Sequence, residues 1–316
     1  MSIDLSCQLL CACEAAYCVA PDAPNGKYNP CNGNPKVTAD MKKQYDAVGF
    51  LEDPYIVTSA QIEAAVVGQT TQGIIVALRG TLAPAKNIDS ILDWMQDLML
   101  EPMSNINLPG KVHSGFLLAV TLLAPGIKEA IEKIQAASSG PLDIYVTGHS
   151  KGGGMAPIMT QYLKNVYGIK ATQAIFFAGP NPGDTDFCNA FNTEFPNTLR
   201  YQNYLDIVPL LPATPMVIDT IETILGSILP QKIKNLLDDA KSWNYSYVGT
   251  MMYIDESRDP AKKESSLEAD LIIAEDWASI GKHLLTGNFA DVANAHHSAC
   301  GYGYMDGTCG TSVCGS

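Results

Sequence analysis

Residues 145–157 read YVTGHSKGGGMAP, and this stretch places a serine among glycines where one type of secondary structure gives way to another. The apolar and β-branched residues 144–147 are typical of a buried strand. Residues 155–167 instead carry apolar side chains at helical spacing. Ser150 is therefore expected in a tight turn between a strand and a helix.

A G-x-S-x-G sequence in such a turn is typical of the nucleophile elbow of α/β-hydrolases, in which the serine is strained and the glycines avoid nearby backbone. An ordinary glycine-rich turn is the plainer alternative. A phosphate-binding loop is excluded, because Lys151 precedes the glycine run and no Ser or Thr follows it as G-x-x-x-x-G-K-[ST] requires. The elbow predicts an α/β fold with a mostly parallel central sheet flanked by helices.

Length and composition limit the alternatives. The 316 residues contain no Pro/Ser-rich linker, repeat or low-complexity tract, so one domain over residues 1–316 is predicted. With 47% hydrophobic and 17% charged residues, the chain can bury a large core. The net charge of −13 excludes the electrostatic binding of nucleic acid and of anionic lipid. Oligomeric state is left open.

The first 18 residues, MSIDLSCQLLCACEAAYC, contain no Lys or Arg, and Gln8 and Glu14 interrupt the apolar run. They are expected to form a packed helix and neither a signal peptide nor a transmembrane segment. Nine cysteines gather near the two ends of the chain, which favours disulfide bonds and an oxidising compartment. The compartment stays open, and no cysteine or histidine spacing indicates a metal site.

A serine hydroxyl becomes an effective nucleophile when a base accepts its proton, and histidine is the usual base. In α/β-hydrolases this histidine follows both the serine and the acid along the chain, which leaves His283, His296 and His297 of the five histidines. His283 lies in a segment with amphipathic helical spacing, which favours a half-buried helix residue. The residues alone leave the choice between His296 and His297, in the loop-like stretch ANAHHSACGYGY, open.

The acid of the catalytic set should follow Ser150 at the end of a later strand. Residues 199–205 read as such a strand, and Asp206 stands at its end before two prolines. A turn-capping role is the plainer reading of Asp206. Asp184 and Asp186, which follow an earlier predicted strand, are rivals for the same role.

An oxyanion hole needs two hydrogen-bond donors. One is usually the backbone amide after the nucleophile, which here belongs to Lys151. The other comes from a loop after an early strand, and residues 74–78 read as a buried strand that Gly80 and Thr81 follow. Thr81 offers both an amide and a hydroxyl.

Several further stretches occur in the order expected of one family. They are VALRGT (76–81), DWMQDL (93–98), VHSGF (112–116), VTGHSKGGGMA (146–156), FAGPNPGD (177–184), DIVPLLP (206–212), YSYVGTMMYI (245–254) and HHSACGY (296–302). With these stretches the chain resembles the class 3 lipase family of α/β-hydrolases from about residue 73 to the end. The resemblance implies Ser150 as nucleophile, Asp206 as acid, and Thr81 and Lys151 as oxyanion donors. Its C-terminal histidine is often followed by Ser and then an aromatic, which favours His297.

The same resemblance implies a lid over residues 82–100, and residues 219–241 look like a helical insertion relative to compact members. Within the lid candidate, apolar residues recur at helical spacing: Ile88, Ile91, Leu92, Met95 and Met99. A core helix is the plainer reading of that pattern.

The expected function is a carboxylic-ester hydrolase of the triacylglycerol lipase type. It would cleave acylglycerol esters at a lipid–water interface through an acyl-enzyme, with no cofactor and no metal. A phospholipase and a short-chain or feruloyl esterase are alternatives within the same fold. A hydrolase-fold binding protein without activity is the alternative from another class.

Overall fold

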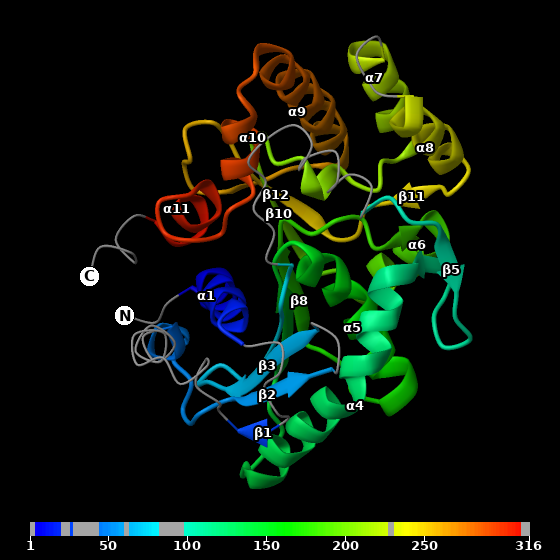
Figure 1. The fold of residues 1–316 in the computed structure, drawn as a ribbon. Coiled ribbons are helices and arrows are strands. Elements are labelled where there is room, and N and C mark those ends of the chain that lie inside the picture. Colours follow the sequence, from blue (N-terminus) through cyan, green and yellow to red (C-terminus); the bar gives the residue numbers. More distant parts are fainter. Residues whose placement is uncertain are drawn as a thin grey trace. The chain divides into compact units, whose positions relative to one another are not determined.

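The computed structural model describes residues 4–19, 26–27, 44–59, 63–81, 98–226 and 231–310. Helices and strands alternate along much of this chain, as an α/β protein requires (Figure 1). The chain divides into two compact units, one of Met1–Thr81 with Phe116–Phe177 and one of Leu82–Gly115 with Ala178–Ser316. One domain over residues 1–316 stays a prediction. Residues 82–97, most of the lid candidate, lie outside the described residues.

The first unit contains a mixed sheet in the order β1-β2-β3-β4-β7-β8. Its strands are β1 (Gly26–Lys27), β2 (Tyr55–Thr58), β3 (Ala64–Gln69), β4 (Ile74–Leu78), β7 (Ile144–Gly148) and β8 (Gln173–Phe177). Its helices are α1 (Leu5–Tyr17), nearly all of α4 (Ser114–Ala137), and α5 (Lys151–Tyr167). Strands β4, β7 and β8 run parallel, and β1, β2, β3 and β4 pair antiparallel.

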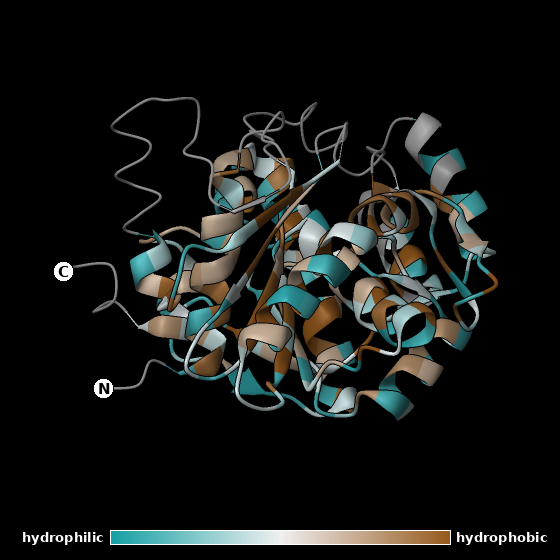
Figure 2. Cartoon of the chain, turned by 90° about the horizontal axis from the view of Figure 1, so that it is seen from below, coloured by the Kyte–Doolittle hydropathy of each residue, from teal (hydrophilic) through white to brown (hydrophobic). Residues whose placement is uncertain are grey.

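Strands β4 and β7 form the centre of this sheet, and every residue of both is buried. Figure 1 shows α1 on one face of the sheet and α4 and α5 on the other, which explains why both faces of these strands are apolar. The inner strands accordingly appear brown in Figure 2, the colour of hydrophobic residues. Helix α1 is apolar around most of its circumference and is buried over most of its length, as expected from the opening sequence.

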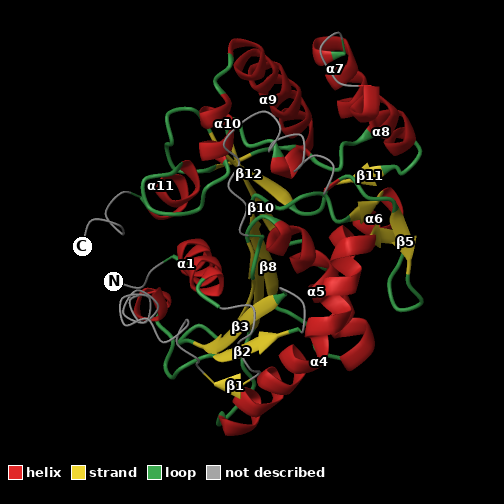
Figure 3. Ribbon diagram, in the orientation of Figure 1, coloured by secondary structure: helices red, strands yellow, loops and turns green. Residues whose placement is uncertain are grey.

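The second unit contains a parallel pair, β10 with β12, which β13 extends antiparallel, and a four-stranded sheet in the order β11-β9-β6-β5 (Figure 3). Its strands are β5 (Pro102–Ser104), β6 (Lys111–His113), β9 (Gly183–Asp184), β10 (Leu199–Asn203), β11 (Tyr245–Ser246), β12 (Thr250–Ile254) and β13 (Lys262–Lys263). Its helices are α6 (Thr185–Glu194), η2 (Val208–Leu210), α7 (Pro215–Leu225), α8 (Gln231–Lys241), α9 (Ser266–Thr286), α10 (Phe289–Ala295) and α11 (Gly303–Cys309).

A hydrophobic core in the second unit fixes the segment that follows β10. The residues after β10, including Leu205, Ile207 and Leu211, pack in one cluster with residues of α7, α8 and α9. Trp277 of α9 is 1% exposed and is the largest side chain of this cluster. Helices α7 and α8 together cover much of residues 219–241, so the described part of the proposed insertion is helical.

Helix α4 is the one described helix that is long and apolar enough to span a membrane by length and composition. Half of its most apolar window is buried, and a core helix meets the same criterion. Cys7, Cys300 and Cys309 are in disulfide bonds, which confirms the expectation of disulfide bonds near the two ends. Of the other described cysteines, Cys11, Cys13 and Cys188 are reduced.

Candidate active site

The turn that holds Ser150 has the predicted elbow geometry. Strand β7 ends at Gly148, helix α5 begins at Lys151, and Ser150 between them has φ 58° and ψ −131°. A positive φ is strained for any residue with a Cβ, so the surrounding backbone must hold it. A Cβ at Gly148 would lie 2.2 Å from the Gly152 carbonyl oxygen, and one at Gly152 would lie 2.1 Å from that of Leu78. Both glycines of the motif are therefore required by close backbone contacts.

Ser150 is 9% exposed, and its amide donates to the carbonyl of Phe177 at the end of β8 (3.1 Å). Lys151 is the first residue of α5, so its amide has no acceptor within the helix and is available to a developing anion. The Lys151 side chain is occupied elsewhere, in an ion pair with Glu63. The oxyanion role predicted for Lys151 thus depends on its backbone amide alone.

Thr81 lies just after β4, and the register of the sheet relates it to the nucleophile turn. Leu78 at the end of β4 pairs with Gly148 at the end of the parallel strand β7. The turn after β4, which leads to Thr81, and the turn that contains Ser150 therefore leave the same edge of the sheet. Arg79 anchors the first of these turns, since its amide donates to Ala64 and its guanidinium to Val19. Thr81 itself is exposed.

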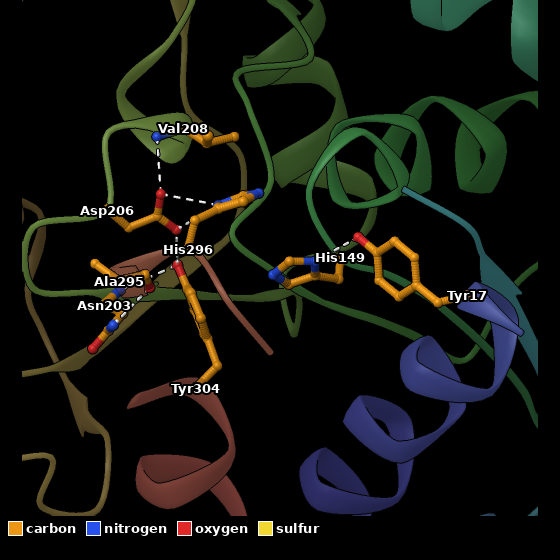
Figure 4. A network of polar contacts seen from close by, with 8 residues as sticks. All are labelled: Tyr17, His149, Asn203, Asp206, Val208, Ala295, His296 and Tyr304. Carbon is orange, nitrogen blue, oxygen red and sulfur yellow. Dashed lines mark hydrogen bonds and ion pairs between the residues drawn. The ribbon is translucent and has the colours of Figure 1, made fainter. Parts of the chain in front are cut away.

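Asp206 lies in the second unit, three residues after β10, and is 1% exposed. Its carboxylate oxygens each lie 3.0 Å from Nδ1 of His296, and the hydroxyl of Tyr304 donates to Oδ2 at 2.7 Å (Figure 4). The amide of Val208 donates to Oδ1 at 3.0 Å. A buried carboxylate is stable only with such partners, and the arrangement holds the imidazole with Nδ1 toward the acid.

The histidine at Asp206 is His296, so the expectation that His297 would lie there is wrong. His296 follows the last residue of α10 and is 6% exposed. His297 is exposed, and its ring lies 4.8 Å from that of Tyr302. Partial desolvation by its surroundings, and then the neighbouring His296, lower the pKa of His297. Adjacent residues at a helix end point in different directions, and here only the first of the two points to the acid.

The rival residues have structural roles. Asp184 caps α6 by accepting from the amide of Phe187 (2.9 Å), and it also accepts from the amide of Lys111 (3.0 Å). Asp186 lies in the first turn of that helix. His283 is half-buried on α9 with Nδ1 2.9 Å from the carbonyl of Ser279, as predicted for a helix residue.

Three polar residues near the candidate site were not predicted. Tyr304 is fully buried, and its hydroxyl accepts from the amide of Asn203 (3.2 Å) while donating to Asp206. Asn203 in turn donates to the carbonyl of Ala295, directly before His296 (2.8 Å). Tyr17 of α1 makes a side-chain hydrogen bond with Ser150. Only Tyr304 had a signal, because the family pattern places an aromatic a few residues after the histidine.

Comparison with known proteins finds a family match over part of the chain and solved structures of similar fold. Residues 75–216 match the family described as Lipase (class 3). A solved triacylglycerol lipase whose catalytic centre is formed by a serine protease triad is similar in fold, with a TM-score of 0.55 over 86% of this chain and 90% of that one, at 19% identity. The matched residues include the Ser150 turn and Asp206, and the match ends before His296. The fold of the chain is that of the α/β-hydrolases.

Other similar proteins match at low identity or over part of their length. The native Rhizomucor miehei lipase propeptide complex has a TM-score of 0.52 over 88% of this chain and 77% of that one, at 20% identity. The Arabidopsis thaliana protein named phospholipase A1-Igamma1 is 26% identical over 74% of this chain. A lipase of Caenorhabditis elegans is 29% identical over 46% of it. The chain spans 47% and 40% of the lengths of these two relatives.

Proposed function

We propose that the protein is a serine carboxylic-ester hydrolase in which Ser150 is the nucleophile, His296 the base and Asp206 the acid that orients it. The observation that carries the proposal is the elbow conformation of Ser150, with φ 58° between β7 and α5. The buried Asp206–His296 pair supports it from the second unit. The order Ser, Asp, His along the chain is that of α/β-hydrolases.

In the proposed reaction, Oγ of Ser150 bonds to the acyl carbon of the ester while its proton passes to Nε2 of the base. Nδ1 of His296 faces Asp206, so Nε2 is the nitrogen that remains for this transfer. The carboxylate stabilises the imidazolium that forms. His296 then gives the proton to the departing alcohol, and the acyl-enzyme remains.

Deacylation repeats these steps with water as the nucleophile. His296 takes a proton from the water, the hydroxide bonds to the acyl carbon, and the proton returns to Oγ as the acid product leaves. In both halves the negative charge collects on the former carbonyl oxygen. The amides of Lys151 and Thr81 and the Thr81 hydroxyl are the proposed donors, and one such donor contributes about 10²- to 10³-fold in rate.

We further propose acylglycerols as the preferred substrates, presented at a lipid–water interface. The support is the match of residues 75–216 to the class 3 lipase family. A phospholipase A1 activity is the second candidate, because three Arabidopsis thaliana relatives carry that name. Fatty acid release from triacylglycerol droplets and from phosphatidylcholine vesicles, compared with a dissolved short-chain ester, would rank the three activities.

Ser150→Ala should leave the fold intact and remove nearly all esterase activity, by about 10⁶-fold, because no other group supplies the nucleophile. The control is organophosphate labelling, which should modify wild type at Ser150 and leave the variant unmodified. More than a few per cent of the wild-type rate in the purified variant would refute the mechanism. A wild-type protein that neither labels nor turns over any of the three esters would instead support a hydrolase-fold binding protein.

A further inference from the structure

Tyr17, the last residue of α1, brings a phenol to the nucleophile turn. Its hydroxyl makes a side-chain hydrogen bond with Ser150 and lies 2.7 Å from Nδ1 of His149, the residue before the nucleophile (Figure 4). The two rings are packed edge to face, with centroids 5.8 Å apart. All three residues belong to the first unit.

The position of Gly80 shows how closely this hydroxyl approaches the turn that leads to Thr81. A Cβ built on Gly80 would lie 2.2 Å from the Tyr17 hydroxyl oxygen and 2.6 Å from the His149 carbonyl oxygen. The phenol therefore occupies the space that any other side chain at residue 80 would need. It lies between the nucleophile turn and the residue before the proposed oxyanion donor.

The phenol stays protonated in this environment. Burial, and then the nearby Glu14, raise the pKa of Tyr17 above its ordinary value. A neutral phenol has one proton to donate and lone pairs that accept, so of its two partners one receives a hydrogen bond and the other donates one. The tautomer of His149 sets the direction: with a proton on Nδ1, His149 donates to Tyr17, and Tyr17 donates to Ser150.

We propose that Tyr17 is a further catalytic residue, which donates a hydrogen bond to Oγ of Ser150 while His149 donates from Nδ1 to the phenol oxygen. This inference rests on the proposed function, since it gives Tyr17 a role only if Ser150 is the nucleophile. Tyr17 keeps its proton throughout the reaction. The serine proton goes to His296, as described above.

The rate effect comes from the change in charge on Oγ. As the serine proton leaves, Oγ becomes alkoxide-like, and a hydrogen bond to a charged oxygen is roughly twice as strong as one to a neutral oxygen. The same charge develops when Oγ leaves in deacylation. The bond already exists in the resting enzyme, so only its strengthening lowers the barrier. The expected contribution is about 10- to 100-fold, which is below that of a full oxyanion donor.

The first test is Tyr17→Phe, which removes one oxygen atom and keeps the ring. On a dissolved short-chain ester, kcat should fall about 10- to 100-fold with KM within about twofold, and the rates of acylation and deacylation should fall together. Tyr245→Phe is the matched control, because Tyr245 is buried and its hydroxyl donates to a backbone carbonyl, that of Leu100 (2.7 Å). The control should lose stability without losing kcat.

A purely structural role for the Tyr17 side chain predicts a different result. If Tyr17→Phe lowers the melting temperature as Tyr245→Phe does and leaves kcat within twofold of wild type, the proposal is overturned. The tautomer is tested with His149→Asn, whose amide can donate from near the position of Nδ1, against His149→Ala. The Asn variant should keep most of the activity and the Ala variant should lose as much as Tyr17→Phe; equal activities would contradict the assigned direction.

The outcome for Tyr17 is distinguishable from failure of the proposed function. Loss of that function would appear as undiminished turnover in Ser150→Ala or as absent labelling in wild type. An overturned role for Tyr17 would appear as unchanged kcat in Tyr17→Phe while Ser150→Ala is inactive.

Discussion

The turn at Ser150 in the first unit and the Asp206–His296 pair in the second are held by different means. Ser150 is fixed by the main chain, because a parallel strand, a helix start and glycines in close backbone contact leave it one conformation. Asp206 and His296, 90 residues apart, are instead joined by side-chain hydrogen bonds that also involve Tyr304. The backbone constraints on Ser150 come from residues close to it in the sequence, so they leave a local sequence pattern. The side-chain hydrogen bonds of Asp206 form only when the tertiary structure brings distant residues together.

The largest effect on kcat is expected at His296, which belongs to the side-chain network and is the proposed base. His296→Ala should reduce kcat about as strongly as Ser150→Ala, by about 10⁶-fold, because the serine loses its base. His297→Ala removes an exposed ring and should change kcat less than about tenfold. Both rates should be measured on the same dissolved ester. The reverse ranking would return the base to His297 and remove Asp206–His296 from the mechanism.

Gly152→Ala should cause the next largest effect on kcat, because it disturbs the close backbone contacts that hold Ser150. The added Cβ would lie 2.1 Å from the Leu78 carbonyl oxygen, so β4 and α5 must separate. We expect a loss of about 3 kcal/mol in unfolding free energy and about 100-fold in kcat from displacement of Ser150. Gly140→Ala, with nothing within 4 Å of the new Cβ, is the control. Equal stability of the two variants in urea denaturation would show that the elbow tolerates side chains.

Asp276 should make the stability of the protein depend on pH. Burial raises its pKa to about 7, against a lowering by the Tyr253 hydroxyl and a further raising by Asp206. Because the folded protein holds this proton more tightly than the unfolded chain, stability falls as pH rises from about 4 to about 7. The loss is at most about 4 kcal/mol, at about 1.4 kcal/mol for each pKa unit.

Urea denaturation across that range checks this expectation. Asp276→Asn keeps the shape of the side chain and should flatten the dependence between pH 4 and 7, whereas the exposed Asp238→Asn should leave it unchanged. If Asp276→Asn retains the full wild-type slope, another group is responsible for it.

The smallest effect is expected for Tyr304→Phe, which weakens the support of Asp206 and leaves the pair itself intact. The variant loses a 2.7 Å hydrogen bond to the carboxylate. We expect about a tenfold fall in kcat and about 1–2 kcal/mol in unfolding free energy. Tyr302→Phe, beside His297, should change neither. Wild-type kcat in Tyr304→Phe would mean that His296 and the Val208 amide suffice to hold Asp206.

The same contrast explains how much the sequence could predict. The elbow at Ser150, the strand that leads to Asp206 and the α/β fold all follow from local patterns, and the structure contains them. The choice between His296 and His297 depends on which side chain points to Asp206 after α10 ends, and no local pattern records that direction. Tyr17 was missed because it lies 132 residues before His149, its hydrogen-bond partner.

The packing of α1 in the first unit limits how far the protein can be truncated from its N-terminus. The family match begins at residue 75, so a fragment designed from that match alone would leave out the opening helix. Yet α1 packs against the central sheet and ends at Tyr17, whose hydroxyl touches Ser150. A version cut at the family boundary would lack β2 and β3 as well and would expose the face of β4 and β7 that α1 covers. A fragment that keeps this packing therefore begins before Leu5, about seventy residues ahead of the start of the family match.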